Sequence, residues 1–503
     1  MKYTARLTAL LLAILLLFGC SPSPAAEHTS MRRNFYQIFV GSFRDSDGDG
    51  LGDLRGITEK LDYLKDLGVN GIWLTPINPS PTYHKYDVLD YYAIDPGFGT
   101  MEDFEELITE AGKRGISIIL DLVINHTSSQ HPWFLAALEE LENGSEPHYQ
   151  LFYNFVDSRL GDGYYPAPGG LFYEAHFWSE MPDLNMDNEE LRDIIADIAR
   201  FWLEKGAAGF RLDAAMHIYS GSQAKNLAFW TWFSDMCREI REDVFLVGEV
   251  WSNEQEILPY FTTGLSLFNF PFSGHSGTIS SAISSGGGGG LSSSIERWDH
   301  EIRSRSPDGV NCLFLSNHDT GRSAGFISDP NKRKLAAAIY LMIPGSPFIY
   351  YGEEIGMTGS GIDENKRTGM VWSLTDPAGI PDNPAAATND RLPAAGVAEQ
   401  LADPDSLLNY YRAVLALKAG YPDILDGEVT QIAVEEDGIC AFWAGSTAVM
   451  HNLTGESVEV SAAGLGVRLG GFVSPTGEAV SIRGNVITMP PFSSAVLTQS
   501  GRR

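Results

Sequence analysis

The fold is decided by the stretch Gly209-Phe210-Arg211-Leu212-Asp213-Ala214-Ala215. Its first residues have the character of a short buried strand, and an acidic side chain follows directly. Because side chains alternate between the two faces of a strand, Arg211 and Asp213 point to the same side. The stretch therefore predicts a buried strand that presents an arginine and a carboxylate together at its carboxyl end.

Seven similar β-type runs occur between residues 34 and 351, and amphipathic helical patterns separate them. With the stretch above, the predicted strands are residues 35–40, 71–74, 117–123, 209–212, 244–247, 267–270, 312–315 and 348–351. Several are apolar at successive positions, as in strands that are covered on both faces. Eight strands alternating with helices predict an α/β fold, a (β/α)₈ TIM barrel.

Two regions interrupt this alternation. About 60 residues rich in Gly, Pro and aromatic residues follow the third strand, too many for an ordinary βα loop. After about residue 427, short alternating runs typical of antiparallel strands replace the helical pattern. We therefore expect a signal over 1–20, a barrel over 31–126 and 186–425, an inserted domain B over 127–185 and a C-terminal β-sandwich over 426–503. The Gly-rich run 284–294 is expected to be a flexible surface loop.

The composition is that of an acidic globular chain. The 503 residues include 35 Lys and Arg against 65 Asp and Glu, a formal net charge of −30, and the 44% hydrophobic content is enough for large cores. This charge argues against nucleic-acid partners and against docking on anionic headgroups. After residue 20 the chain has three cysteines, Cys237, Cys312 and Cys440, and this odd number predicts free thiols rather than a disulfide framework.

The first twenty residues have the pattern of an export signal. Lys2 and Arg6 precede an apolar run over 7–18, which is short for a membrane span and ends just before Cys20. This resembles a bacterial lipoprotein signal, in which cleavage leaves a lipidated N-terminal cysteine. The resemblance implies an extracytoplasmic protein whose only membrane contact is a lipid on Cys20. The alternative is an ordinary secretory signal that ends in cysteine by chance, which would give a secreted protein.

Three carboxylates follow predicted strands of the barrel: Asp213, Glu249 and Asp319. Residues at the carboxyl ends of barrel strands meet on one face, where such enzymes place their active sites. Hydrolysis of a glycosidic bond with retention needs an ionised carboxylate nucleophile and a protonated carboxylic acid about 5–5.5 Å apart. Arg211 would keep the nucleophile ionised, and the other carboxylates would help the acid to keep its proton.

These strand ends resemble, in order, the four signature regions of the α-amylase superfamily of glycoside hydrolases. The matching strings are Asp121-Leu122-Val123-Ile124-Asn125-His126, the stretch 209–215, Gly248-Glu249-Val250-Trp251 and Ser316-Asn317-His318-Asp319. Three further matches lie at 68–76, 181–185 and 345–352, so the resemblance covers about residues 34–500. It implies that Asp213 is the nucleophile, that Glu249 is the general acid/base and that Asp319 stabilises the transition state. The implied sugar-binding residues are Tyr86, His126, Arg211, His217, His318, Asp363 and Arg367.

An acidic loop, Asp45-Ser46-Asp47-Gly48-Asp49-Gly50-Leu51-Gly52-Asp53, follows the first strand. It matches the start of an EF-hand loop, but Gly56 stands where the bidentate glutamate belongs, so an EF-hand is excluded. Similar loops in oligo-1,6-glucosidase-like members bind Ca²⁺, and they imply as ligands Asp45, Asp47, Asp49, the Leu51 carbonyl and Asp53. Many α-amylases hold a second Ca²⁺, which would here use Asn125, Asp183 and the His217 carbonyl.

The subgroup is indicated by Ala214 and by the string Met181-Pro182-Asp183-Leu184-Asn185. The string resembles the bacterial α-amylases intermediate between oligo-1,6-glucosidase and neopullulanase types, which implies a monomeric enzyme on internal α-1,4 bonds of glucans. One departure is Met216, where many α-amylases have a lysine that binds sugar on the leaving-group side, so that subsite is expected to be weaker. The alternatives are an α-glucosidase or cyclomaltodextrinase-like transferase on short glucans, and a non-catalytic glucan-binding lipoprotein.

Overall fold

The computed structural model describes residues 32–389 and 391–499. The expected signal over 1–20 and its Cys20 lie outside the described residues. Within the described part, no helix is long and apolar enough to cross a membrane.

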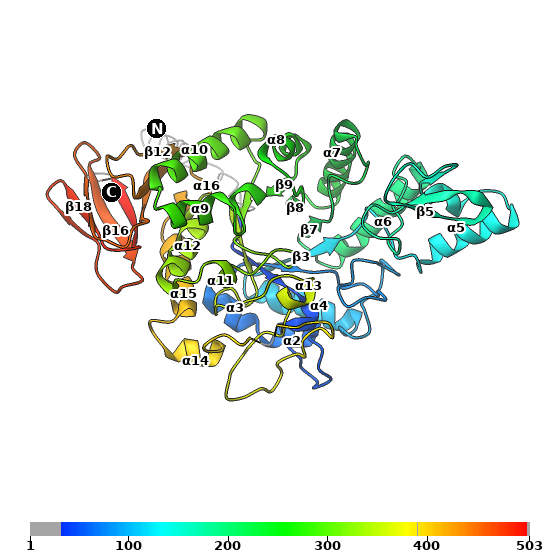
Figure 1. Cartoon of the computed structure of the whole chain (residues 1–503), viewed down its shortest axis with the longest axis horizontal. Helices are drawn as coiled ribbons and strands as arrows, with labels where there is room; N and C mark the ends of the chain where they lie inside the picture. The colour runs from blue at the N-terminus through cyan, green and yellow to red at the C-terminus, as the bar shows by residue number, and fades with distance from the viewer. Residues whose placement is uncertain (1–31, 390, 500–503) are drawn as a thin grey trace, which may run out of the picture. The chain divides into compact units, whose positions relative to one another are not determined.

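The centre of the molecule is a closed barrel of eight parallel strands (Figure 1). The strands are β1 (Phe35–Ile38), β2 (Gly71–Leu74), β3 (Ser117–Leu122), β7 (Gly209–Leu212), β8 (Phe245–Gly248), β9 (Ser266–Phe268), β10 (Asn311–Leu313) and β11 (Ser346–Tyr350). Each pairs in parallel with the next, and β11 closes the ring on β1. The predicted TIM barrel is confirmed. Strands β2 and β7 match their predicted ranges, and the others differ by one or two residues at one or both ends.

Helices cover the outside of this barrel between successive strands. The longer ones are α3 (Leu61–Leu67), α4 (Met101–Lys113), α6 (Glu189–Glu204), α7 (Gln223–Ile240), α9 (Thr278–Ser285), α10 (Gly288–Arg305), α12 (Pro330–Met342) and α15 (Leu407–Ala419). Short helices are α2 (Leu54–Glu59), α8 (Glu254–Ile257), α11 (Ser323–Phe326), α13 (Asp363–Lys366), α14 (Val397–Ala402) and α16 (Asp423–Asp426). Helix α4 begins in a capping box formed by Thr100 and Asp103. The apolar faces of the helices bury Leu61 and Leu64 of α3 and Ile195 and Ile198 of α6 against the barrel.

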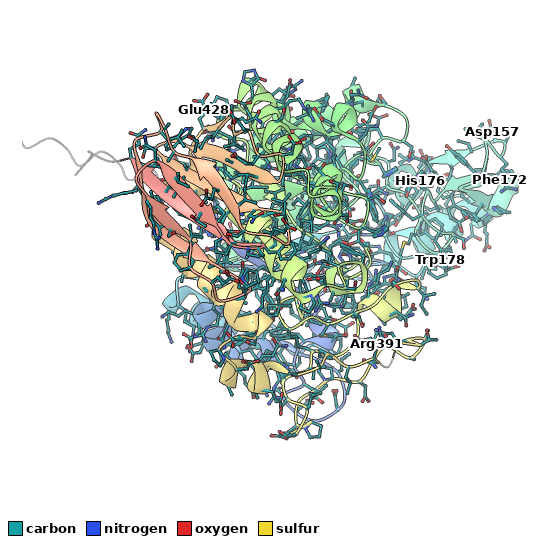
Figure 2. All side chains as sticks on the ribbon, turned by 60° about the vertical axis from the view of Figure 1, so that its left-hand side comes forward. Asp157, Phe172, His176, Trp178, Arg391 and Glu428 are labelled. Carbon is teal, nitrogen blue, oxygen red and sulfur yellow. The ribbon has the colours of Figure 1, made fainter. Side chains whose placement is uncertain are left out.

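The segment between β3 and α6 forms the inserted domain. It contains α5 (Pro132–Asn143) and a small antiparallel sheet of β4 (Phe155–Val156), β5 (Tyr164–Pro166) and β6 (Phe172–Glu174). An isolated bridge from His126 to Asp183 holds its two ends together where it leaves the barrel, and a second bridge joins Tyr153 to Leu184 within it. In Figure 2, His176 and Trp178 lie on the side nearer the barrel, whereas Asp157 and Phe172 lie at the outer end.

The C-terminal region consists of two antiparallel sheets. A five-stranded sheet contains β12 (Val429–Gln431), β13 (Ile439–Ala444), β14 (Thr447–Asn452), β19 (Ser494–Gln499) and β16 (Val467–Val473). A three-stranded sheet contains β15 (Val458–Ser461), β18 (Val486–Met489) and β17 (Ser481–Arg483). A separate apolar cluster joins the two sheets, with Met450 and Leu497 from the first and Val460 and Ile487 from the second. This packing is that of a β-sandwich.

The expectation of a flexible loop at 284–294 is wrong. Only the turn after α9 is irregular, and helix α10 begins at Gly288. The Gly288 N–H donates to the Asp437 carbonyl at 2.8 Å, and a Cβ on Gly288 would lie 2.2 Å from the backbone of Ile439. The glycine therefore permits the first turn of α10 to pack directly on the C-terminal sheet, a tertiary contact that composition does not reveal.

Candidate active site

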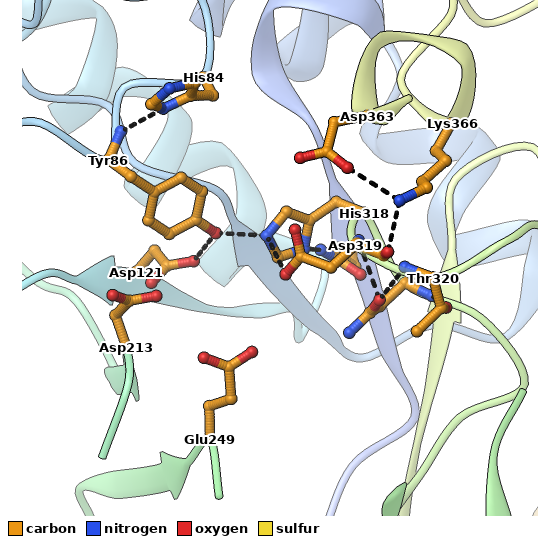
Figure 3. A network of polar contacts seen from close by, with 12 residues as sticks. His84, Tyr86, Asp121, Asp213, Glu249, His318, Asp319, Thr320, Asp363 and Lys366 are labelled. Carbon is orange, nitrogen blue, oxygen red and sulfur yellow. Dashed lines mark hydrogen bonds and ion pairs between the residues drawn. The ribbon is translucent and has the colours of Figure 1, made fainter. Parts of the chain in front are cut away.

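A cleft of about 520 Å³ opens at the carboxyl ends of the barrel strands. Asp213 follows β7, Glu249 follows β8 and Asp319 lies in the segment after β10, and all three line this cleft. Figure 3 shows their carboxyl groups directed toward one common space. The structure thus brings together the three carboxylates that the sequence singled out.

Arg211 organises the floor of the cleft. Its side chain is 1% exposed, one terminal nitrogen contacts Asp121 Oδ1 at 2.8 Å and Asp213 Oδ1 at 2.6 Å, and the other contacts Glu249 Oε1 at 2.7 Å. Burial lowers the pKa of Arg211, but Asp121, Glu249 and Asp213 outweigh this, and the net shift is well upward. The guanidinium therefore remains charged and fixes Asp213 and Glu249 as neighbours across one planar group.

Asp121 is a part of the site to which the sequence analysis gave no role. It pairs in register with Arg211 across β3 and β7, so both side chains enter the barrel at the same level. Its second oxygen accepts hydrogen bonds from Tyr86 Oη at 2.7 Å and Trp73 Nε1 at 3.2 Å. Burial raises the pKa of Asp121 to about 7. The sequence feature that could have identified Asp121 is an acidic residue inside an otherwise apolar strand.

The backbone after β7 is bent toward β8. Ala214 has a φ of +47°, a left-handed conformation that costs energy for a residue with a side chain. Its N–H donates to Glu249 Oε2 at 3.2 Å, and the Ala215 N–H donates to the Glu249 carbonyl at 3.0 Å. These contacts fix the Glu249 side chain relative to the strand that carries Asp213.

The electrostatics of Glu249 favour its protonated form. Burial raises the pKa of Glu249 to about 8, with Asp213 and Asp319 adding to the increase and Arg211 opposing it. A carboxyl group with this pKa keeps its proton at neutral pH, as a general acid must.

A hydrogen-bonded chain connects Tyr86, His318 and Asp319. His318 Nε2 lies 2.7 Å from Tyr86 Oη and 3.1 Å from an Asp319 oxygen, while its Nδ1 faces the Gln37 amide nitrogen at 2.7 Å (Figure 3). Because Gln37 can only donate through this nitrogen, Nδ1 accepts and Nε2 carries the hydrogen. Burial, together with nearby cations, lowers the pKa of His318 well below its usual range. A neutral ring thus donates toward the tyrosine and Asp319.

Asp363 and Arg367 also line the cleft, next to Asp319. Arg367 contacts Asp319 Oδ1 at 2.8 Å and Asp363 Oδ2 at 3.1 Å, so it connects two of the predicted residues. Lys366 donates to the Asp319 carbonyl at 2.6 Å and also contacts Asp363 Oδ1 at 2.8 Å. Lys366 was not among the residues predicted for the site, since a lysine after a strand is usually solvated.

Residues of the inserted domain and of the adjoining barrel segments form another wall of the cleft. His126 donates through Nε2 to the Tyr86 carbonyl at 3.2 Å, and burial lowers its pKa. The Phe177 ring packs edge-on against His217, with ring centroids 5.2 Å apart. It also packs at a tilt against His126, with ring centroids 5.5 Å apart. Burial and the neighbouring His176 lower the pKa of His217 to about 4, so this ring is neutral near pH 7.

Asn125 and Asp183 lie side by side where the inserted domain joins the barrel. Asn125 Nδ2 donates to Asp183 Oδ1 at 3.1 Å, and the His176 N–H donates to Asp183 Oδ2 at 3.0 Å. Asn125 Oδ1 is buried and has no hydrogen-bond partner. Burial raises the pKa of Asp183 to about 8. A cation that prefers oxygen ligands could bind the side-chain oxygens of both residues. Asp183 supplies the only carboxylate of this pair.

The acidic loop after β1 brings three carboxylates together. Oxygens of Asp45, Asp47 and Asp49 lie within 4.8 Å of one another, a donor set that suits a hard cation. Asp53, at the end of the same loop, caps α2 and accepts from the Gly56 N–H at 2.7 Å. A Cβ at Gly56 would lie 2.1 Å from the Arg44 carbonyl, so no glutamate fits there, which explains the departure from the EF-hand pattern.

Three exposed aromatic residues of the cleft were not selected from the sequence: Phe177, Trp178 and Trp251. His84 also lines it. Aromatic residues are frequent in the inserted segment, so the sequence does not distinguish those that face the cleft from those that do not. Trp251 stands two residues after Glu249, and this position beside a predicted catalytic residue was the available signal.

Comparisons with known proteins agree with this geometry. The family model "Alpha amylase, catalytic domain" matches residues 37–427. "Alpha-amylase 3" of Dictyoglomus thermophilum is 42% identical over 411 residues, covering 81% of each chain, and "Probable oligo-1,6-glucosidase 2" of Bacillus subtilis is 33% identical, covering 78% of this chain and 84% of its own. The crystal structure of the α-amylase from H. orenii superposes with a TM-score of 0.84 at 38% identity, covering 93% of this chain and 99% of its own. With its closed barrel and converging carboxylates, the chain belongs to the α-amylase family of glycoside hydrolases.

Proposed function

We propose that the protein is a retaining endo-acting α-amylase that cleaves internal α-1,4-glucosidic bonds of starch, glycogen or maltooligosaccharides. One observation carries the mechanism: a single buried guanidinium, that of Arg211, holds Asp213 and Glu249 side by side. This arrangement suits the close pair of carboxyl groups that double displacement requires.

In the first step, a carboxylate oxygen of Asp213 attacks the anomeric carbon. Glu249 donates its proton to the glycosidic oxygen, so the leaving sugar departs with a hydroxyl group and a glucosyl ester remains on Asp213. In the second step, the ionised Glu249 takes a proton from water, which attacks the anomeric carbon from the opposite side and releases Asp213. Two inversions retain the α configuration.

The surrounding residues act on the sugar in the cleaved subsite. We assign Asp319, which is held by Arg367, to stabilisation of the positive charge that develops at the anomeric carbon. His126 and His318, which line the cleft, are proposed to contact the sugar together with the buried Arg211, and Tyr86 offers its ring as a stacking surface. Asp363 and Arg367 would bind the next sugar toward the non-reducing end, and His217 would contact the leaving-group side.

The function is tested with soluble starch and maltoheptaose. We expect release of reducing sugar from both, with internal cleavage of maltoheptaose into several products, because an endo-acting enzyme cuts a chain at more than one bond. Proton NMR of the fresh products should show the α-anomer first. Absence of reducing sugar would reject the enzyme and favour the glucan-binding alternative. Removal of single glucose units, or a preference for cyclic and short glucans, would favour the α-glucosidase or cyclomaltodextrinase-like alternative.

We also propose that the acidic loop binds Ca²⁺ through Asp45, Asp47, Asp49, the Leu51 carbonyl and Asp53. The bound ion would stabilise the fold, because the loop is hydrogen-bonded to a segment far away in the sequence. The Asp45 N–H donates to the Gly379 carbonyl at 3.1 Å. A second Ca²⁺ is proposed at Asn125, Asp183 and the His217 carbonyl, which is supported by the unpaired Asn125 oxygen.

Removal of calcium with EDTA is expected to lower the melting temperature by on the order of 5 °C, because an ion bound to the folded state alone stabilises it. Asp47→Asn should weaken this response, whereas Asp162→Asn, an exposed acid of the inserted domain, should not. Calorimetry gives the melting temperature, and elemental analysis of Asp47→Asn and Asp183→Asn assigns the ions. An unchanged melting temperature in EDTA would contradict the proposal for the loop.

We further propose that the protein is exported, lipidated on Cys20 and held at the outer face of a membrane as a monomer. The support is the sequence pattern over residues 1–20. Mass spectrometry of the N-terminus tests the lipid, and an unmodified, cleaved N-terminus elsewhere would favour the secreted form.

A further inference from the structure

The segment between β10 and α11 forms a loop that carries His318 and Asp319. Inside the loop, the Asp319 N–H donates to Asn317 Oδ1 at 3.0 Å. The loop is closed at its base, where the Ser323 N–H donates to Ser316 Oγ at 3.3 Å. The position of Asp319 in the cleft therefore depends on how this base is held.

Glu353 connects the base of the loop to two helices on the outside of the barrel. The residue follows β11 and is 2% exposed. One carboxylate oxygen accepts from Ser316 Oγ at 2.8 Å, and the other accepts from the hydroxyls of Tyr340 on α12 and Tyr411 on α15 at 2.9 and 3.0 Å. Because Ser316 gives its hydrogen to Glu353, the Ser316 oxygen is free to accept the Ser323 N–H.

The burial of Glu353 calls for an explanation, because a carboxylate loses its hydration inside a protein. The three donated hydroxyl groups offset this cost, so the carboxylate can remain at this place. Glu353 is not one of the described residues that line the cleft. It can therefore act on the substrate only through the loop that it holds.

The next residue, Glu354, is equally buried but contacts another part of the barrel. It is 0% exposed, and its Oε1 accepts from the hydroxyls of Tyr36 on β1 and Tyr63 on α3 at 2.7 and 2.6 Å. The chain thus contains two adjacent buried glutamates that both accept from tyrosines. Only Glu353 also holds the loop that carries Asp319.

We propose that Glu353 is a positioning residue, which acts through Ser316 to hold Asp319 where it stabilises the transition state. This inference rests on the function proposed above and adds a residue outside the cleft to its machinery. A fixed negative charge helps most when it already lies opposite the positive charge that develops at the anomeric carbon. Loosening the base of the loop should therefore lower kcat more than it raises KM.

The test compares Glu353→Gln with Glu354→Gln on maltopentaose. Each substitution replaces one acceptor oxygen by a donor inside the protein, so both should lower the melting temperature. For Glu353→Gln we expect kcat to fall about tenfold, as for a small displacement of a reacting group, with KM within about threefold, whereas Glu354→Gln should keep kcat within about twofold. With α-maltosyl fluoride the loss in Glu353→Gln should persist, because the positive charge develops whichever group leaves.

A milder pair of variants makes the same comparison if a glutamine variant does not fold. Ser316→Ala removes one hydroxyl from Glu353 and should also lower kcat about tenfold, whereas Tyr63→Phe removes one hydroxyl from Glu354 and should leave kcat unchanged. The double variant Glu353→Gln/Ser316→Ala should be no slower than the slower single variant, because both changes break one hydrogen bond.

Equal losses of kcat in Glu353→Gln and Glu354→Gln, or a wild-type kcat in Ser316→Ala, would overturn the inference. A wild-type protein that cleaved neither maltopentaose nor the fluoride would instead overturn the proposed function.

Discussion

Asp213→Asn is expected to lower kcat on maltoheptaose by at least about 10⁴-fold while the protein still binds the substrate. The amide is isosteric with the carboxylate and can keep one oxygen on Arg211, which Asp213 contacts at 2.6 Å. It cannot form the glycosyl ester, because the amide is a far weaker nucleophile. Stopped assays with purified protein measure the turnover, and calorimetric titration with maltoheptaose measures the binding.

A matched control separates loss of the nucleophile from loss of charge. Asp187→Asn removes an exposed acid that pairs with Lys225 outside the cleft and should leave kcat unchanged. Circular dichroism should show the wild-type fold for both variants. Asp213→Asn with more than a few per cent of wild-type turnover would contradict the assignment of the nucleophile.

Glu249→Gln is expected to lower kcat/KM on maltooligosaccharides by about 10³-fold, because the leaving sugar loses its proton donor. On α-maltosyl fluoride the first step needs no proton, so one equivalent of fluoride should be released rapidly. The second step then lacks its base, and the maltosyl ester on Asp213 should accumulate. Intact-protein mass spectrometry would detect this adduct, and added azide should release it as α-maltosyl azide, because its attack is the second inversion at the anomeric carbon.

The pH profile gives an independent test of Glu249. Its pKa of about 8 means that the acid form is present below that pH and is lost as the pH rises through it. Wild-type kcat/KM on maltopentaose should therefore decline above about pH 8, whereas glycosylation by α-maltosyl fluoride should lack this alkaline limb. Glu256→Gln, an exposed residue of α8, serves as the control and should keep the limb. A fluoride reaction with the same decline would contradict the role of Glu249.

Much of the fold and site could be predicted because local patterns determine them. The short apolar runs and the helical faces predicted the closed barrel, and Asp213, Glu249 and Asp319 follow strands whose carboxyl ends meet on one face. The Gly-rich run was misread because Gly288 is required by a contact with Ile439, which lies 151 positions later in the chain. Composition alone cannot distinguish a flexible glycine from one that allows close packing.

The sequence by itself determined that Asp213, Glu249 and Asp319 meet at the barrel mouth, since strand order and strand ends are encoded by periodicity and motif. Only the tertiary structure decided their electrostatic states and their neighbours. Burial gives Glu249 its high pKa, and register across β3 and β7 joins Asp121 to Arg211. The stacking of the Trp251 ring on Phe270 likewise depends on the ends of two strands, β8 and β9, which meet in space. Desolvation and packing arise from the closed fold as a whole, so no local stretch of sequence specifies them.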